Sequence, residues 1–136
     1  MRKSLFLIVF LLSFSMFAAE RAVFRDSRGR RQGTAVTNGA RTTYRDAAGR
    51  ISHTAKQQGN VTRYYDSSGR RVGSATENNQ RTTYRDASGR ITGTATVTGN
   101  RTIYRDASGS RVGSSRVNGG TTTYRDNKGR ICGSKR

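Results

Sequence analysis

Short stretches rich in Thr, Val, Ile and Tyr alternate with clusters of Asp, Asn and Gly along residues 20–136. Thr, Val, Ile and Tyr suit β-strands, whereas Asp, Asn and Gly are typical of turns. We therefore predict an all-β fold, an antiparallel β-meander of six two-strand repeats, each about twenty residues long. The expected architecture is an open or curled single sheet. The alternative is a β-solenoid, in which twenty-residue coils stack equivalent residues on one another.

The repeat is visible as residue types that recur at a spacing of twenty. The aromatic positions are Phe24, Tyr44, Tyr64, Tyr84, Tyr104 and Tyr124, and each is followed two residues later by an Asp. One Gly recurs at positions 29, 49, 69, 89, 109 and 129. A second Gly occupies positions 33, 73, 93, 113 and 133, with His53 in the remaining slot. This self-similarity predicts a single six-unit repeat domain over residues 20–136.

Each unit contains two turn signals. Segments such as Asp46 to Gly49 predict a four-residue loop, because Asp opens turns with its side chain and Gly accepts the left-handed conformation that closes them. Dipeptides such as Asn38-Gly39 predict a tight hairpin in which both residues have positive φ. The two signals together fix an expected strand register.

Counting back from these turns places Gly33 opposite Tyr44 and Arg45 opposite Arg50, with Ile51 on the face that carries Tyr44. A tyrosine ring lying over a cross-strand glycine covers exposed backbone. We therefore expect structural roles for the residues of these two rows, which are Tyr44, Tyr64, Tyr84, Tyr104, Tyr124, Gly33, Gly73, Gly93 and Gly113.

The first residues have the pattern of an export signal. Arg2 and Lys3 precede the apolar run Leu5 to Leu12, and Ala18-Ala19 offers small residues for cleavage. Together these features predict a signal peptide over residues 1–19 and a secreted or periplasmic protein with no integral membrane span after cleavage. The apolar run is shorter than the roughly 20 residues that a spanning helix needs. An uncleaved anchor is the alternative.

The remaining chain is strongly basic and poor in large apolar residues. Arg2 and Lys3 leave with the signal peptide, so 24 of the 26 basic residues face all 8 acidic residues, a formal charge of +16. Val, Ile and Phe make up about a tenth of the mature chain, too few for an ordinary globular core. Such a chain is either disordered or built from repeats that support one another, and the six-fold spacing favours repeats.

The expected register places arginines opposite one another on the face away from the tyrosines. Like charges directly opposite are destabilising, so the arginines either splay into water or contact a polyanion. The chain has 22 Arg and four Lys, and the planar guanidinium binds phosphate, sulfate or carboxylate in a two-pronged way. The expected polyanion-binding residues are Arg25, Arg30, Arg45, Arg50, Arg70, Arg85, Arg90, Arg105, Arg125 and Arg130.

Two functions follow from this pattern. The first is a non-catalytic binding protein that contacts an acidic envelope or extracellular polymer, such as an acidic polysaccharide, a glycolipid or a nucleic acid, through its arginine face. The second is a structural, self-assembling surface protein that associates through its tyrosine face and strand edges. Polyanion binding should weaken steeply with salt, whereas such self-association should strengthen as charge is screened.

The sequence offers little enzyme chemistry. His53 occupies a slot that is Gly in the other units, which favours a tolerated strand substitution over a catalytic base or ligand. The Asp residues occupy equivalent turns, whereas an acid–base pair needs two different environments. We therefore expect no enzyme, no cofactor and no metal. Cys132 is the only cysteine, so it is a candidate for an intermolecular disulfide in a homodimer.

The motif Tyr-x-Asp-x-x-Gly-Arg, recurring at twenty residues, resembles the YD repeats of Rhs-type and teneurin-like exported proteins. The segment Tyr64 to Arg70 is the copy most similar to it, because Tyr65 directly precedes Asp66, whereas the other units have Arg before Asp. MORN-like repeats are similar at a coarser level. The resemblance implies a strand-turn-strand unit. Large YD-repeat proteins form shells around cargo or bind carbohydrate, and we expect six units to be too few for a closed shell.

Overall fold

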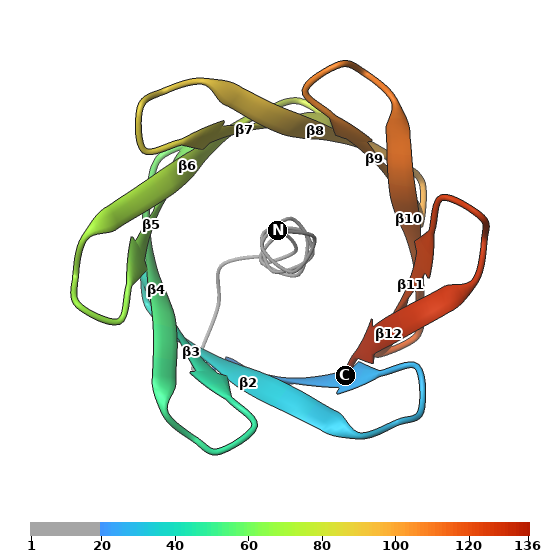
Figure 1. The fold of residues 1–136 in the computed structure, drawn as a ribbon, viewed down its shortest axis with the longest axis horizontal. Coiled ribbons are helices and arrows are strands. Elements are labelled where there is room, and N and C mark those ends of the chain that lie inside the picture. The colour runs from blue at the N-terminus through green and yellow to red at the C-terminus, as the bar shows by residue number, and fades with distance from the viewer. Residues whose placement is uncertain (1–19) are drawn as a thin grey trace.

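The computed structural model describes residues 20–136, which form twelve β-strands, two in each repeat (Figure 1). The predicted signal peptide, residues 1–19, lies outside the described residues. No helix capable of crossing a membrane occurs in residues 20–136. The strands are β1 (Glu20–Asp26), β2 (Arg31–Asn38), β3 (Arg41–Asp46), β4 (Ile51–Gln58), β5 (Val61–Asp66), β6 (Arg71–Asn78), β7 (Arg81–Asp86), β8 (Ile91–Thr98), β9 (Arg101–Asp106), β10 (Arg111–Asn118), β11 (Thr121–Asp126) and β12 (Ile131–Lys135).

The twelve antiparallel strands close into a barrel, because β1 pairs with β12 as well as with β2 (Figure 1). The all-β class is confirmed, but the open or curled sheet, the solenoid and the expectation that six units cannot close are wrong. At the seam Asp26 pairs with Gly133, as Asp46 pairs with Gly33 between the first two units. The sixth unit thus pairs with the first in the same register that joins the other neighbouring units. The shifts in strand register between the six units therefore add up to the total shift that a closed barrel requires.

The tight turns between units use different central residues from those expected. Asn38 pairs with Arg41, so the two-residue loop is Gly39-Ala40. Gly39 has a φ of 59°, and Asn38 is not among the residues with positive φ. A positive φ at the first central residue alone is the pattern of a type II′ turn, whereas the expected type I′ turn needs it at both. The equivalent first central residues are Gly59, Asn79, Gly99 and Gly119.

This difference moves the strand register by two residues and keeps every side chain on its face. Tyr44 lies opposite Ala35, and Gly33 lies opposite Asp46, so the expected pair of Gly33 with Tyr44 is wrong. The equivalent expected pairs of Gly73, Gly93 and Gly113 with the tyrosine that follows them are wrong for the same reason. The cross-strand pairs of tyrosine and glycine form instead across the other hairpin, as Tyr64–Gly73, Tyr84–Gly93, Tyr104–Gly113 and Tyr124–Gly133.

The glycine of these pairs occupies a place where two backbones approach closely. A Cβ added to Gly73 would lie 2.5 Å from the carbonyl oxygen of Arg85 on the neighbouring strand, and one added to Gly93 or Gly113 would lie 2.6 Å from the equivalent oxygen. The absence of a side chain therefore allows neighbouring units to approach each other.

The Asp-containing turns are also one residue shorter than expected. The N–H of Asp46 donates to the carbonyl of Arg50 at 2.9 Å, and the N–H of Gly49 donates to the carbonyl of Asp46 at 3.0 Å. These bonds define a three-residue loop in which Gly49 has a φ of 86°. Arg50 therefore lies opposite Asp46, and the expected pairing of Arg45 with Arg50 is wrong. The same holds for the equivalent pairs that end in Arg30, Arg90 and Arg130.

A β-bulge follows each Asp-containing turn. Arg45 pairs with Ile51, whereas Tyr44 pairs with His53, so one residue of β4 has no partner. The bulge rotates Ile51 to the outer face, where it is 43% exposed. Because bulges bend and twist hairpins, these six turns project outward from one end of the barrel (Figure 1). The expected position on the tyrosine face is therefore wrong for Ile51. It is wrong in the same way for the residues that the twenty-residue repeat makes equivalent to Ile51, which are Arg71, Ile91, Arg111 and Ile131.

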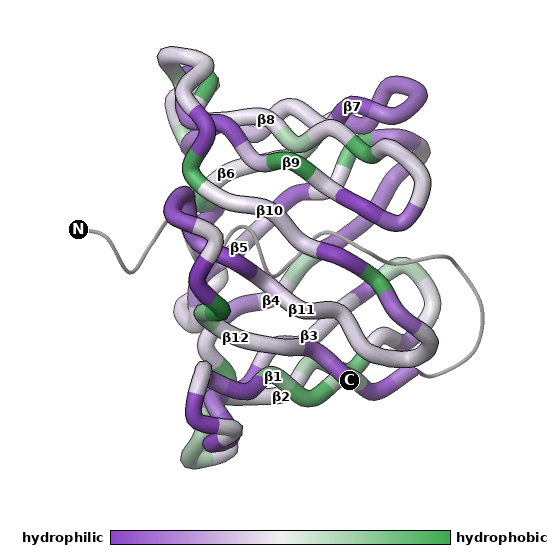
Figure 2. Tube along the Cα trace, turned by 90° about the vertical axis from the view of Figure 1, so that its right-hand side faces the viewer, coloured by the Kyte–Doolittle hydropathy of each residue, from purple (hydrophilic) through white to green (hydrophobic). Residues whose placement is uncertain are grey.

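The inner face carries one aromatic residue per unit and small residues between them. Phe24 and the five equivalent tyrosines are between 3 and 8% exposed, and the alanines of the same face are equally buried. Burial raises the pKa of each of these tyrosines, so the hydroxyls stay protonated. Rings packed over alanines explain how a chain with few large apolar residues builds a core. Figure 2 shows the barrel from the side, with the two sets of turns at opposite ends.

Candidate anion-binding surface

The exposed residues of the strands form the outside of the barrel, here called the outer wall. In β3, Arg41 and Arg45 are exposed, whereas the alternate residues Thr42 and Tyr44 are buried. Residues paired across neighbouring strands share a face, so the register extends this assignment around the barrel. The basic residues of the outer wall are Arg21, Arg25, Arg31, Arg41, Arg45, Lys56, Arg63, Arg71, Arg81, Arg85, Arg101, Arg105, Arg111, Arg116 and Arg125.

The carboxylates lie away from the outer wall. Glu20 shares its face with buried Ala22, and Glu77 shares its face with buried Ala75, so both belong to the inner face. The remaining six are the Asp residues that begin the projecting turns. Within residues 20–136, the strand surface of the outer wall therefore carries basic side chains without carboxylates between them.

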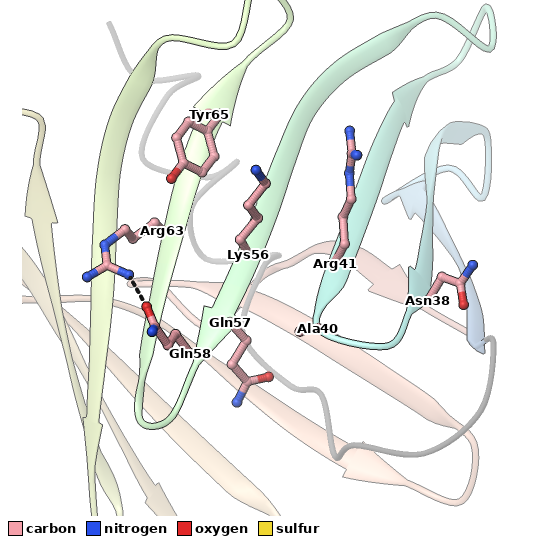
Figure 3. A pocket seen from close by; sticks show the side chains of 8 residues that line it. All are labelled: Asn38, Ala40, Arg41, Lys56, Gln57, Gln58, Arg63 and Tyr65. Carbon is pink, nitrogen blue, oxygen red and sulfur yellow. Dashed lines mark hydrogen bonds between the residues drawn. The ribbon is translucent and has the colours of Figure 1, made fainter.

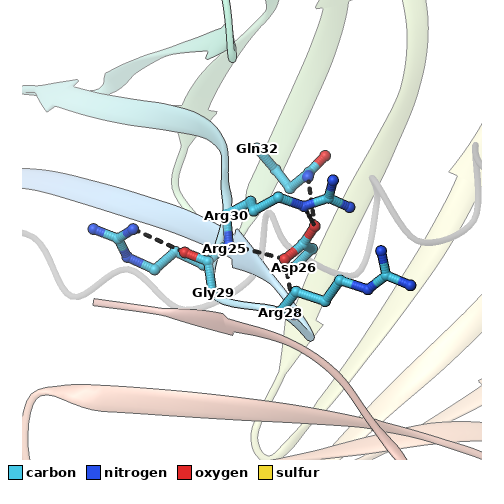
Figure 4. Close-up of polar contacts among 6 residues, drawn as sticks. All are labelled: Arg25, Asp26, Arg28, Gly29, Arg30 and Gln32. Atoms are coloured by element: carbon cyan, nitrogen blue, oxygen red, sulfur yellow. Dashed lines mark hydrogen bonds and ion pairs between the residues drawn. The ribbon is translucent and has the colours of Figure 1, made fainter.

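Each recurrent Asp is held by the backbone of its own turn. Oδ1 of Asp26 accepts the N–H groups of Arg28 and Arg30, both at 2.9 Å (Figure 4). These bonds favour the ionised carboxylate and lower the pKa of Asp26, the backbone bond from Arg30 contributing most. In three other turns a serine hydroxyl also donates to the carboxylate and is the largest cause of its lowered pKa; these carboxylates are Asp66, Asp86 and Asp106.

The arginine before each Asp also contacts the turn. Nη1 of Arg25 donates to the carbonyl of Gly29 at 3.0 Å (Figure 4). The same contact, at 2.9 to 3.1 Å, is made by Arg45, Arg85, Arg105 and Arg125. A guanidinium carries five N–H donors, so this bond fixes the side chain and leaves other donors for an anion. These five expected anion-binding residues are exposed and also support the turns.

The arginines after the turns differ from one another. Arg30 and Arg130 form ion pairs of 2.9 Å with the Asp of their turn, and the equivalent distance for Arg50 is 3.7 Å. The structure shows no such ion pair for Arg70 or Arg90 among the described residues. Exposed pairs of this kind stabilise a protein little. The expected set is thus divided between outer-wall residues and residues at the projecting turns.

A row of three basic residues crosses the outer wall at the other end of the strands and was missed from the sequence. Arg41 pairs with Lys56, and Lys56 pairs with Arg63, across β3, β4 and β5. Together with Tyr65 and Gln58 these residues line a shallow hollow of about 450 Å³ (Figure 3). This row could have been found only with the correct registers of both hairpins, because Arg41 and Lys56 pair across the bulged hairpin and Lys56 and Arg63 pair across the tight-turn hairpin.

His53 and Cys132 occupy partly buried positions. Nδ1 of His53 is buried without a hydrogen-bond partner among the described residues, and burial lowers the pKa of the imidazole, an effect that Asp66 partly opposes. Cys132 packs against the core, and burial raises the pKa of its thiol. A raised pKa lowers the thiolate fraction, and the expected disulfide between two chains stays a prediction.

Residues 20–136 contain no cluster of three or more His, Cys, Asp or Glu side chains that could hold a metal ion. No protein-family model matches the chain, and a comparison with curated proteins finds no match. The resemblance to YD and MORN-like repeats therefore stays a prediction from the motif.

Proposed function

We propose that this protein is exported and binds acidic polymers of the cell envelope or the extracellular space through the outer wall, without catalysing a reaction. The observation that carries the proposal is the separation of charge. Basic side chains recur around the outer wall, whereas Glu20 and Glu77 belong to the inner face of their strands and the Asp carboxylates are held in turns. A cylinder with this charge distribution attracts a polyanion from every side.

Arginine is the residue suited to this task, because its planar guanidinium accommodates two oxygens of a phosphate, sulfate or carboxylate at once. The turn contacts of Arg25 and its equivalents fix the side chains before a ligand arrives. A side chain that is already ordered loses less conformational freedom on binding. An acidic polysaccharide, a glycolipid and a nucleic acid all carry the required charge.

Retention on an acidic polysaccharide column, compared with a neutral polysaccharide column, tests the proposal. We expect the mature protein to bind heparin and to elute earlier as salt rises, and to pass through the neutral column. Equal retention on both columns, or retention on heparin that salt does not weaken, would overturn the proposal.

The alternative, self-assembly, depends on an accessible tyrosine face and on free strand edges. The tyrosine face lies inside the barrel, and each described strand is paired on both sides. A closed barrel has no free strand edge through which copies could join.

A further inference from the structure

The six units are nearly equivalent, and several departures from the repeat lie together at one place on the outer wall. Lys56 stands where β2, β6 and β8 have Val36, Thr76 and Thr96, whereas the fifth and sixth units have Arg116 and Arg136 at this position. Arg63 stands where the other units have Val, Thr or Ile, and Tyr65 stands where they have Arg. The strand register joins Lys56 and Arg63 to Arg41, and Tyr65 lines the same hollow from two residues further along β5, so these residues form one site on β3, β4 and β5.

The geometry points to a binding site for an anionic saccharide in this hollow, a pyranose ring lying on Tyr65 with its sulfate, phosphate or carboxylate group between Arg41, Lys56 and Arg63. This inference rests on the proposed function and names the site and ligand within it. Nζ of Lys56 lies 5.5 Å from the centre of the Tyr65 ring, which brings a cation and an aromatic face together. Figure 3 shows these side chains around the hollow.

The three basic residues are suited to a compact anion. Adjacent strands are about 4.8 Å apart, and Lys56 on β4 occupies the position between Arg41 on β3 and Arg63 on β5. The residues that line the hollow include no carboxylate, so nothing there neutralises the row. Like charges directly opposite one another destabilise a sheet, and a bound oxyanion removes this repulsion.

The other lining residues favour a saccharide as carrier of the anion. Tyr65 is the single aromatic side chain of the described residues on the outer wall, whereas a single-stranded nucleic acid uses a succession of aromatic platforms. The amides Asn38, Gln57 and Gln58 also line the hollow, and amides donate to and accept from sugar hydroxyls. Gln58 already accepts a hydrogen bond of 3.1 Å from Nη1 of Arg63, which orients that guanidinium.

Three single substitutions of the mature protein separate this site from general charge attraction. Lys56→Thr and Tyr65→Arg each introduce the residue found at the equivalent position of other units, so both variants should fold. Tyr65→Arg also adds one positive charge. Arg116→Thr is the matched control, because Arg116 is the equivalent of Lys56 in the fifth unit and pairs with Arg101.

The measurement is the affinity for a sulfated heparin disaccharide, for glucose 6-phosphate and for a short oligothymidylate, by calorimetric titration. We expect the wild-type protein to bind at least one of the two anionic sugars, and Lys56→Thr and Tyr65→Arg to weaken that binding about tenfold, while Arg116→Thr changes it less than twofold. The sugar that binds identifies a sulfate or a phosphate as the anion.

Several results would overturn the site. One is an affinity of Tyr65→Arg for the sugar that is unchanged or higher, and another is a loss of sugar affinity in Arg116→Thr equal to that in Lys56→Thr. The others are a wild-type protein that binds neither sugar, and oligothymidylate binding that depends on Tyr65 as strongly as sugar binding does. Retention of long heparin separates the two proposals. If the site fails while the wild-type protein stays on heparin, the proposed function stands without it. If the wild-type protein is not retained on heparin either, both the saccharide site and the proposed function are rejected.

Discussion

At the scale of single residues, the aromatic position of each unit shows which structural features the repeat pattern predicts and which it does not. The recurrence of Tyr44 and its equivalents predicted that these residues share one face, and the register keeps them on one face. These side chains are only 3–8% exposed because the sheet closes into a barrel around them. No single position in the sequence predicts that closure. The exposure of the arginines on the alternate positions follows from the same periodicity of two.

The hydroxyl of Tyr64 supplies a stability test. It is buried without a hydrogen-bond partner among the described residues. Phe24 occupies the equivalent position in the first unit and packs in the same buried cluster without a hydroxyl. A buried hydroxyl without a partner costs about 1 kcal/mol or more. We expect Tyr64→Phe to raise the free energy of unfolding by about 1 kcal/mol in urea titrations.

The control is Tyr104→Phe. The hydroxyl of Tyr104 lies 3.0 Å from Oγ of Ser115, so its removal should lower the free energy of unfolding by about 1 kcal/mol. An equal loss of stability in both variants would mean that the Tyr64 hydroxyl has a partner after all.

His53 should make stability depend on pH in a defined window. Burial lowers the imidazole pKa in the folded state, whereas an unfolded histidine titrates near about 6.5. The unfolded state therefore takes up the proton first as pH falls, and folded stability declines below about pH 6.5 by at most about 1.4 kcal/mol per pH unit. The decline ends once the folded imidazole is also protonated.

His53 is the only histidine of the chain, and the carboxylates of Asp26, Asp66, Asp86, Asp106 and Asp126 titrate at lower pH because hydrogen bonds in their turns lower their pKa values. His53→Gln should therefore remove the decline between about pH 6.5 and pH 5. Thermal melts of both proteins across this range are the measurement. A decline of the same size in His53→Gln would assign the effect to other groups.

At the scale of the elements, the sequence located both kinds of turn but misassigned their central residues. An Asn-Gly pair signals a hairpin, but whether it fills positions one and two or two and three of the turn depends on the backbone of both strands. The structure places Asn38 before the turn and Gly39 within it. The bulge at Ile51 was missed because an extra residue on one strand leaves no composition signal of its own.

The third unit tests the turn assignment directly. Asn79 has a φ of 54° and is the one residue other than Gly with a positive φ among those described. Asn79→Gly should raise the free energy of unfolding by about 0.5 kcal/mol, since Gly adopts this conformation without steric cost. Asn78→Gly should instead lower it by about 1 kcal/mol, because Oδ1 of Asn78 accepts a hydrogen bond from Asn60.

Thermal or urea unfolding of both variants is the measurement. A type I′ turn centred on Asn78 and Asn79 would need positive φ at both residues, so both variants would then be more stable than the wild-type protein. That result would contradict the assigned turn.

At the scale of the whole molecule, the closure of the sheet into a barrel is the feature that could not be predicted from the sequence. The pairing of β1 with β12 joins the two ends of the repeat domain, whereas turn signals act over a few residues. Closure also decides the functional interpretation, because it hides the tyrosine face and leaves the arginines as the surface. The basic row of Arg41, Lys56 and Arg63 was invisible for a related reason, since it depends on a register that was two residues off.

A cross-link at the seam tests closure. Arg25 pairs with Ser134, and paired residues of antiparallel strands have Cα atoms about 4.5 to 5.5 Å apart, within reach of a disulfide. In a Cys132→Ser background, Arg25→Cys with Ser134→Cys should form an internal disulfide that stabilises the fold by roughly 4 kcal/mol. Non-reducing gels and mass spectrometry are the measurement.

The control pairs Arg25→Cys with Ser114→Cys, since Ser114 occupies the position of Ser134 one unit earlier. It should give no internal disulfide. An open sheet would leave both double-cysteine variants without an internal bridge, and that outcome would contradict the barrel.

The central claim is that the outer wall binds acidic polymers, and the salt dependence of heparin affinity tests it most directly. Arg71, Arg81 and Arg101 lie on the outer wall, and their side chains form no hydrogen bond or ion pair with the other described residues. Their replacement by Gln should lower the slope of log Kd against log salt concentration by about one for each anionic group of the polymer that the variant no longer binds. The melting temperature should stay unchanged.

The charge-matched control replaces Arg28, Lys128 and Arg136, which lie at turn tips and at the chain end, by Gln. It should leave the slope close to that of the wild-type protein. Equal slopes in the two variants would show that net charge, rather than the outer wall of the barrel, governs binding, and would contradict the account.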